Sequence, residues 1–179
     1  MKTLVAMDTK LLFLLRDFLM ALPFGERFWT SISWLGDGGR IWILFGIFLL
    51  LYPKTRKWGI VMFASLGVNA VLCNLILKPM IFRMRPYDAL DYTPLIASLS
   101  DGSFPSGHTS ASFACAVVLW HMNRKAGVAA FVFSTLMALS RIYVGVHYPF
   151  DVLAGVLLGA FSAYVVLTLK KRKRTNKIK

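Results

Sequence analysis

Residues 58–86 read WGIVMFASLGVNAVLCNLILKPMIFRMRP, a stretch that joins a long apolar run to a short cationic one. The run 58–77 has about the 20 residues that an α-helix needs to cross the hydrocarbon core of a bilayer. It ends at Lys78, and Arg83 and Arg85 follow closely. Ionisable side chains are costly beside an apolar segment, and their presence there indicates function. The stretch therefore predicts a membrane helix that delivers cations to a functional site.

Four further apolar runs accompany it, at 41–52, 109–120, 128–139 with an extension to 146, and 152–169. Because 57% of the 179 residues are hydrophobic and the mean hydropathy is +0.62, we exclude an ordinary soluble domain. We predict an all-α fold, a polytopic membrane helical bundle with five transmembrane helices, or six if the N-terminal segment inserts. The chain is expected to form one domain, with an N-terminal helical segment 1–35, a catalytic core 36–169 and a basic tail 170–179.

The N-terminal run 11–24 is the weakest candidate span, since it contains Arg16 and Asp17 and is broken by Pro23 and Gly25. It is either a poor first span or a helix that lies in the membrane interface. A cleavable signal peptide is disfavoured, because charges interrupt the apolar run and no small-residue cleavage site follows it.

The net charge of +13 is distributed by loop. If the spans alternate in direction, one side of the bilayer collects Lys54, Arg56, Lys57, Arg124, Lys125 and the tail 170–179. The positive-inside rule makes that side cytoplasmic, so the loop 78–105 and the turn 145–149 face the extracytoplasmic side of the cell membrane. The basic tail is then a topology signal that contacts anionic lipid, and nucleic-acid binding is not expected.

The segment 105–108, PSGH, leads into the apolar run 109–120. Ser106 is a good N-cap, and Gly107 lets the backbone approach a ligand closely, so the free N–H groups of this helix start form an anion site. His108 lies in the first turn of the same helix. The alternative is a plain helix cap beside a satisfied histidine.

The segment 140–151, SRIYVGVHYPFD, is more specific. Gly145 can end one helix, and Pro149 is tolerated in the first turn of the next. His147 then lies just before that helix, and Asp151 is near enough to accept a hydrogen bond from one imidazole nitrogen. The other nitrogen is left as a nucleophile, following the logic by which a third group orients a catalytic base. The alternative is a capping carboxylate beside an interfacial histidine.

If the predicted spans are correct, four cations lie near the two histidines, namely Lys78, Arg83, Arg85 and Arg141. Positive charge is disfavoured on the outer face, so these side chains need an anionic partner, and a phosphate fits. The eight acidic residues and three histidines are too sparse for an easy two-metal cluster, and the GxxxxGK[ST] phosphate loop is absent. Cys73 and Cys115 lie in apolar runs without zinc-ligand spacing. We therefore predict phosphoryl transfer to His147 without a metal or cofactor.

The chain resembles the type 2 phosphatidic acid phosphatase superfamily over 36–169, by the ordered motifs Lys78-x6-Arg85-Pro86, Pro105-Ser106-Gly107-His108 and Ser140-Arg141-x5-His147-x3-Asp151. The resemblance implies that His147 attacks phosphorus and forms a phosphohistidine, while Asp151 holds its ring. It implies that His108 protonates the leaving oxygen and then activates water. The resemblance also implies which groups bind the phosphoryl oxygens and stabilise the transition-state charge, namely Lys78, Arg85, Arg141, Ser106 and the Gly107 amide.

The chain looks most like small bacterial membrane members that dephosphorylate lipid phosphates and diphosphates. We expect undecaprenyl diphosphate as substrate, because Arg83 adds one cation beyond the motifs and a diphosphate brings a second anionic group. Phosphatidylglycerophosphate or phosphatidic acid hydrolysis is the alternative, and transfer of phosphate to another lipid would use the same intermediate. A non-catalytic lipid-binding protein is disfavoured by the intact His108, His147 and Asp151. The sequence does not predict the oligomeric state. The alternative role for Arg83 is contact with a lipid headgroup in place of a second phosphate.

Overall fold

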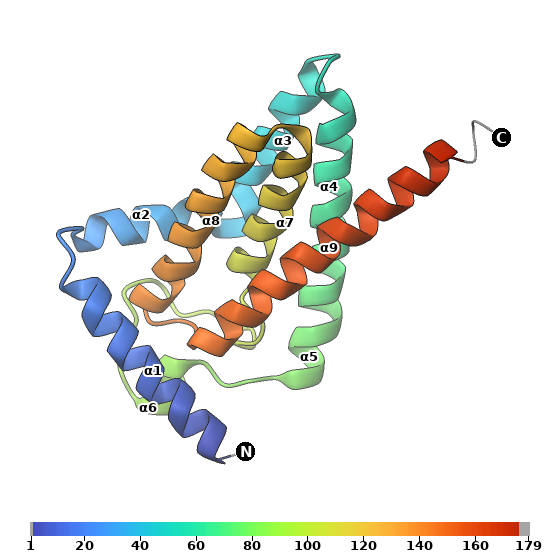
Figure 1. Cartoon of the computed structure of the whole chain (residues 1–179). Helices are drawn as coiled ribbons and strands as arrows, with labels where there is room; N and C mark the ends of the chain where they lie inside the picture. The colour runs from blue at the N-terminus through green and yellow to red at the C-terminus, as the bar shows by residue number, and fades with distance from the viewer. Residues whose placement is uncertain (1, 176–179) are drawn as a thin grey trace.

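The computed structural model describes residues 2–175, and every regular element in that range is a helix, as predicted. Residues 176–179 of the predicted basic tail lie outside the described residues. In Figure 1 the elements, with η1 a 3-10 turn and η2 a π-helical turn, are α1 (Lys2–Met20), α2 (Glu26–Gly36), η1 (Asp37–Gly39), α3 (Arg40–Leu51), α4 (Arg56–Ala70), η2 (Val71–Leu77), α5 (Lys78–Ile81), α6 (Pro86–Leu90), α7 (Gly107–Met122), α8 (Arg124–Tyr143) and α9 (Pro149–Thr175).

The predicted apolar runs correspond to α3, α4 with η2, α7, α8 and α9. Helix α8 ends at Tyr143, and residues 144–148 form the turn into α9, so the last part of the apolar run to 146 lies in this turn. Within 2–175, four helical stretches are long and apolar enough to cross a membrane, namely Glu26–Leu51, Arg56–Leu90, Arg124–Tyr143 and Pro149–Arg172. Helix α7 has only 16 residues, yet it packs against α4, α8 and α9 and forms the centre of the bundle.

Glycines on α9 allow this helix to cross α7 closely. A β-carbon added at Gly155 would lie 2.8 Å from the carbonyl oxygen of Ser106, and one at Gly159 would overlap the carbonyl oxygen of Ser110. Small residues at a crossing let the backbones of membrane helices approach each other. The crossing also brings the first turns of both helices together, where Ser106 N donates to Asp151 O at 3.0 Å.

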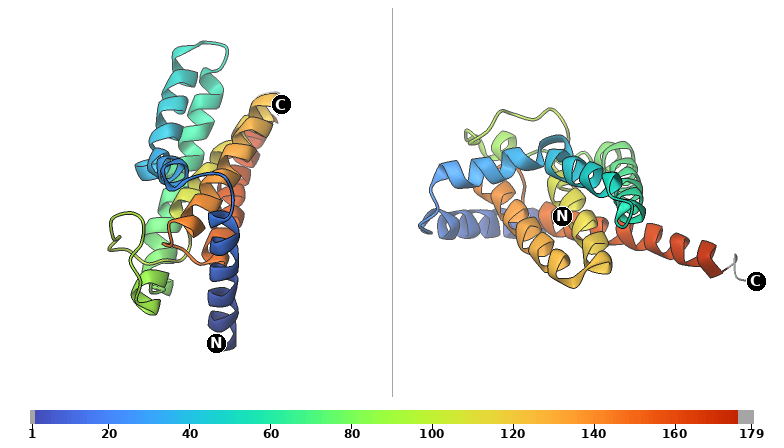
Figure 2. Two further views of the ribbon diagram at one scale, coloured as in Figure 1. Left: turned by 90° about the vertical axis from the view of Figure 1, so that its left-hand side faces the viewer. Right: turned by 90° about the horizontal axis from the view of Figure 1, so that it is seen from above.

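The chain turns sharply between α2 and α3. Gly38 and Gly39 have φ angles of 60° and 73°, in the left-handed region that glycine adopts without steric cost. As a result, α2 runs across the bundle and α3 runs along it (Figures 1 and 2). The candidate span Glu26–Leu51 is therefore bent, and the bend leaves Asp37 at the end of the bundle where α3 begins.

The motif segments gather at one end of the bundle and the basic turns at the other. The end of α4 with α5, the start of α7 and the turn between α8 and α9 all lie at the lower end in Figure 1. The turns between α3 and α4 and between α7 and α8 lie at the upper end, as does the C-terminal part of α9. The helices from α3 to α9 thus alternate in direction as the sequence predicts.

Helix α1 is attached to the bundle by one face. Leu12 and Leu19 are buried in the core, whereas Phe18 is exposed. Arg16 Nε donates to the carbonyl oxygen of Tyr143, at the end of α8, at 3.2 Å. Helix α1 is not one of the four candidate spans, but its contacts join the predicted N-terminal segment to the core.

Candidate active site

Five of the eight predicted site residues line one pocket of about 570 Å³, which is a usual size for a small-molecule site. The polar end of the pocket is formed by Lys78, Arg85, Asp101, Gly107, His108 and His147. The rest of the wall is mostly apolar, although it contains Asn69 and Asn74. It comes largely from α4, and its apolar members include Ile43, Phe63, Leu66, Gly67 and Ala70. Three predicted site residues are fully buried outside this lining, namely Ser106, Arg141 and Asp151.

His147 lies in the turn between α8 and α9, where Gly145 has a φ of 79° and ends the first helix as predicted. The residue is 1% exposed, and Nε2 lies 3.5 Å from Arg85 Nη1 at the polar end of the pocket. Burial lowers the pKa of His147 below its usual value. The imidazole is therefore neutral near pH 7, and one ring nitrogen has a lone pair for attack on an electrophile.

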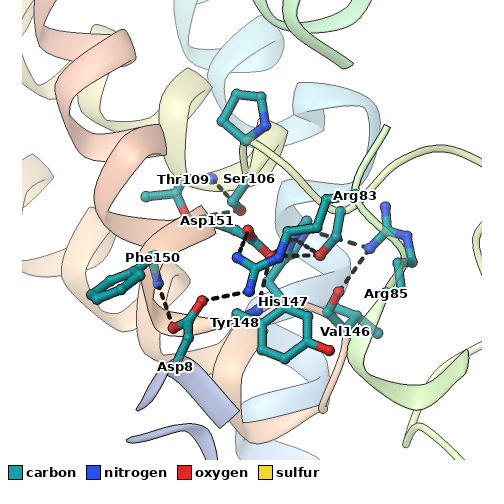
Figure 3. A network of polar contacts seen from close by, with 12 residues as sticks. Asp8, Arg83, Arg85, Ser106, Thr109, Val146, His147, Tyr148, Phe150 and Asp151 are labelled. Carbon is teal, nitrogen blue, oxygen red and sulfur yellow. Dashed lines mark hydrogen bonds and ion pairs between the residues drawn. The ribbon is translucent and has the colours of Figure 1, made fainter. Parts of the chain in front are cut away.

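Asp151, in the first turn of α9, is held by donors from three segments. Its Oδ2 accepts from Ser103 Oγ at 2.5 Å and from Tyr148 N at 2.9 Å, and its Oδ1 accepts from Arg83 Nη1 at 2.6 Å (Figure 3). The distance from Oδ2 to His147 Nδ1 is 3.7 Å, longer than a direct hydrogen bond. Ser103 Oγ lies 3.4 Å from the same nitrogen, so the serine hydroxyl contacts both members of the predicted pair.

Lys78 and Arg85 both contact Asp101, in the loop that precedes α7. Arg85 donates from Nη2 to Asp101 Oδ1 at 2.6 Å and from Nε to the backbone oxygen at 2.9 Å, and Lys78 Nζ pairs with Oδ2. Burial acts to raise the pKa of Asp101, but the hydrogen bonds and charges of Lys78 and Arg85 outweigh it and lower this pKa to about 2. The two cations are thus arranged to bind a pair of anionic oxygens.

Arg141 is 0% exposed and donates from Nη1 to Ser33 Oγ, on α2. Among the described residues, its Nε and Nη2 have no hydrogen-bond partner. A buried guanidinium with two free donors is unfavourable unless an anion completes its bonding. The arrangement therefore indicates an anionic ligand at this end of the bundle.

Ser106 is the N-cap of α7, as predicted. Its Oγ accepts from Thr109 N at 3.5 Å and from Thr109 Oγ1 at 3.0 Å. The hydroxyl is therefore used to cap the helix, while Gly107 and His108 of the first turn face the pocket. His108 Nε2 lies 2.8 Å from Asp37 Oδ1, at the bend before α3. The second histidine is thus within direct hydrogen-bond distance of a carboxylate, whereas His147 lies 3.7 Å from its carboxylate.

Arg83 is not the spare cation that the sequence analysis expected for a second phosphate. Its guanidinium lies between Asp151 and Asp8, at 2.6 Å and 2.7 Å, and 3.9 Å from the centre of the Tyr148 ring (Figure 3). The residue is outside the pocket lining. Two buried carboxylates already compensate its charge, so the charge argument for a diphosphate substrate loses its basis.

Five polar residues that contact the motif residues or Arg83 were not predicted from the sequence, namely Asp8, Ser33, Asp37, Asp101 and Ser103. Asp101 and Ser103 stand just before PSGH, so closeness to a motif was a usable signal. Asp8, Ser33 and Asp37 are far along the chain from their partners. An acidic residue in an apolar segment is the one feature that could have marked Asp8.

Comparison with known proteins links this site to one family. A model of the PAP2 superfamily matches residues 58–175. The chain is 33% identical over 124 residues to the undecaprenyl-diphosphatase BcrC of Bacillus subtilis, covering 69% of this chain and 63% of that protein. It is 32% identical over 140 residues to an undecaprenyl-diphosphatase of Sulfolobus acidocaldarius, covering 77% and 68%. The aligned part is thus just under two thirds of the length of the first relative and just over two thirds of the second.

A solved structure extends the similarity to the N-terminal helices. The crystal structure of a transmembrane PAP2 type phosphatidylglycerolphosphate phosphatase from Bacillus subtilis matches with a TM-score of 0.76 and 27% identity. The match covers 96% of this chain and 88% of that one.

Replacing Ser103 by alanine should lower kcat for phosphate release from a lipid phosphate roughly 10- to 100-fold, because Asp151 loses a hydrogen bond to its charged form. KM should change little, since Ser103 is outside the pocket lining. Ser162→Ala is the matched control, because Ser162 is equally buried and donates to its own helix, at Leu158 O. Equal kcat values for Ser103→Ala and the control would show that Asp151 does not need this hydroxyl.

Proposed function

This chain belongs to the PAP2 superfamily, and we propose that it is an integral membrane phosphatase that removes phosphate from a lipid. The observation that carries the proposal is the division of the pocket, with cations and two histidines at one end and a largely apolar wall along the rest. A phosphorylated lipid has the same division into a charged head and an apolar tail. A protein that merely held such a lipid would have no use for a neutral imidazole beside the cations.

In the proposed first step, the lone pair of His147 Nε2 attacks phosphorus, an N–P bond forms and the P–O bond to the leaving group breaks. Asp151, with Ser103, orients the ring and stabilises its developing positive charge. His108, whose hydrogen-bond partner is Asp37, gives a proton to the leaving oxygen. In the second step His108 takes a proton from water, the water oxygen attacks phosphorus, and the N–P bond breaks to release phosphate.

Binding of the phosphoryl oxygens is assigned to Lys78, Arg85, Arg141 and the Gly107 amide. Arg141 is anchored through Nη1 to Ser33 and keeps two donors unpaired, so these donors are available to stabilise the transition state. Lys78 and Arg85 exchange the Asp101 carboxylate for the phosphate. Ser106 contributes by fixing the start of α7.

We also propose that this chemistry needs no metal ion. A two-metal phosphatase needs a cluster of carboxylate and histidine ligands. Within residues 2–175, no three His, Cys, Asp or Glu side chains gather in an arrangement that could hold a metal ion. The cations of the pocket take the role of neutralising the phosphoryl charge.

A polyprenyl diphosphate is the first candidate substrate, supported by the two relatives named undecaprenyl-diphosphatases, at 33% and 32% identity. Phosphatidylglycerophosphate is the second candidate. It is favoured by the solved phosphatidylglycerolphosphate phosphatase, which matches 96% of this chain. The pocket's cations recognise the phosphate that both lipids share.

The pocket is proposed to face the extracytoplasmic side of the cell membrane. Basic residues mark the opposite end of the bundle, in the turn from α3 to α4, at the start of α8 and near the end of α9. Segments rich in Lys and Arg stay in the cytoplasm. The site would then meet lipids of the outer leaflet.

Phosphate release from a panel of lipids tests the proposed function. The purified protein in detergent should hydrolyse undecaprenyl diphosphate with a higher kcat/KM than phosphatidylglycerophosphate or phosphatidic acid, and EDTA should not change the rate. The His147→Ala variant serves as the control for contaminating phosphatases. A preference for phosphatidylglycerophosphate would replace the first candidate substrate, and no release from any of the three lipids would contradict the function. Activity lost with EDTA and restored by Mg²⁺ would contradict the metal-free step.

Trapping the intermediate tests the roles of the histidines. Denaturation in alkali soon after mixing with a phosphorus-labelled substrate should leave label on the wild-type chain and none on His147→Ala. The His108→Ala variant should lose roughly 10²- to 10⁴-fold in turnover, the usual cost of removing a general acid. It should recover part of this loss with a substrate that has a good leaving group. Label on the His147→Ala chain would assign the nucleophile to another residue.

Cysteine labelling tests the proposed orientation. The native Cys73 and Cys115 are buried, so single cysteines introduced at exposed Ser98 and at Thr175 can be compared on a low background. An impermeant thiol reagent added to intact cells should label the cysteine at position 98 and leave that at position 175 unlabelled. The reverse pattern would place the site on the cytoplasmic side.

A further inference from the structure

The N-terminal helix α1 carries a carboxylate that is completely buried. Asp8 is 0% exposed, and it accepts hydrogen bonds from Arg83 Nη2 at 2.7 Å and from Phe150 N at 3.1 Å (Figure 3). A buried charge is tolerated when it is paired and hydrogen-bonded. Asp8 belongs to none of the three motifs, lies outside the matched region 58–175 and does not line the pocket.

Arg83 connects Asp8 to Asp151. Its Nη2 faces Asp8, and its Nη1 donates to Asp151 Oδ1 at 2.6 Å. The guanidinium carbon lies 3.9 Å from the centre of the Tyr148 ring, a cation–π contact that holds the group in place. The backbone oxygen of Arg83 accepts from Ser103 N at 2.8 Å, so Arg83 also holds the serine that donates to Asp151.

We propose that Asp8 and Arg83 are positioning residues for the phosphoryl transfer, with Arg83 fixing the Asp151 carboxylate and Asp8 fixing Arg83. This rests on the proposed function, because the step that responds is phosphorylation of His147. Helix α1 is then part of the working active site, although Asp8 and Arg83 are 75 positions apart in the chain.

Because two carboxylates share the Arg83 guanidinium, its two terminal nitrogens bond to different partners. With Asp8 present, each carboxylate takes one terminal nitrogen, and Asp151 Oδ2 stays with Ser103 Oγ and Tyr148 N. Without Asp8, Arg83 is free to direct both nitrogens to Asp151, because the bidentate fork is the preferred geometry of a guanidinium and a carboxylate. That rotation draws Oδ2 away from Ser103 and from the imidazole that it orients.

A purely anchoring role for Asp8 makes a different prediction. In that case loss of the carboxylate loosens α1 and lowers the melting temperature, and its effect on turnover is independent of Arg83. A double-mutant cycle separates the two roles, since residues that act through one another give non-additive losses.

The experiment compares Asp8→Asn, Arg83→Gln, the double variant, Arg83→Lys and Asp17→Asn in detergent. Asp17 is the matched control, because it is a carboxylate on the same helix outside this network. The readouts are monodispersity, melting temperature, kcat, KM and the single-turnover rate of phosphohistidine formation with a lipid phosphate.

Arg83→Gln should slow phosphohistidine formation roughly 10- to 100-fold and Asp8→Asn about tenfold, with KM within about threefold of wild type. The double variant should be no slower than Arg83→Gln alone, because Asp8 acts through Arg83. Arg83→Lys, which keeps the charge without the fork, should fall between wild type and Arg83→Gln. Asp17→Asn should match wild type.

A wild-type rate for Asp8→Asn, or losses that multiply in the double variant, would overturn the inference. If wild type and Asp17→Asn themselves release no phosphate, the proposed function fails instead. Should Arg83→Gln not fold, the cycle is run in the Arg83→Lys background, where Asp8→Asn must again add less than it does alone.

Discussion

The carboxylate of Asp151, at the start of α9, is fully buried, so its hydrogen-bond donors must come from the protein and not from water. It accepts hydrogen bonds from the Ser103 hydroxyl, the Tyr148 backbone N–H and the Arg83 guanidinium. These three donors come from the loop before α7, the turn between α8 and α9, and the segment that follows α5. Satisfying one buried charge therefore fixes the relative positions of three segments. The proposed nucleophile, His147, stands on one of them and is placed as a consequence.

Three cations at the same end of the bundle are incompletely paired with carboxylates. Asp101 is shared between Lys78 and Arg85, and Arg141 keeps two donors unpaired among the described residues. A phosphate relieves both conditions, because it supplies several anionic oxygens at one place. The largely apolar wall from α4 lies beside these cations, so an isolated inorganic ion would leave most of the pocket unused. Charge and shape together favour a phosphate that carries an apolar tail.

Sequence reasoning succeeded where chemistry is local. The apolar runs predicted the helices, Gly145 and Pro149 predicted the turn before α9, and Ser106 was predicted as the N-cap of α7. The sequence predicted a direct hydrogen bond between His147 and Asp151, but the two side chains are 3.7 Å apart and both contact the Ser103 hydroxyl. The position of Ser103 could not be predicted, because it depends on how its loop packs. Arg83 was misread because neither Asp8 nor the rotation of its own side chain can be deduced from spacing. Contacts between distant segments depend on tertiary packing, which periodicity and motif spacing do not encode.

The bend at 37–39 also bears on how the chain enters the membrane. Since α3 starts at the pocket end, the residues before it are carried to that side on the proposed topology where α1 lies in the membrane interface, one of the two predictions for the N-terminal segment. Residues 2–37 hold four basic side chains, at Lys2, Lys10, Arg16 and Arg27, and four acidic ones, at Asp8, Asp17, Glu26 and Asp37. Moving one elementary charge across the membrane potential costs or releases about 2.3 kcal/mol per 100 mV. Because these side-chain charges cancel, the potential does almost no net work on the segment during its translocation, in a protein whose overall charge is +13.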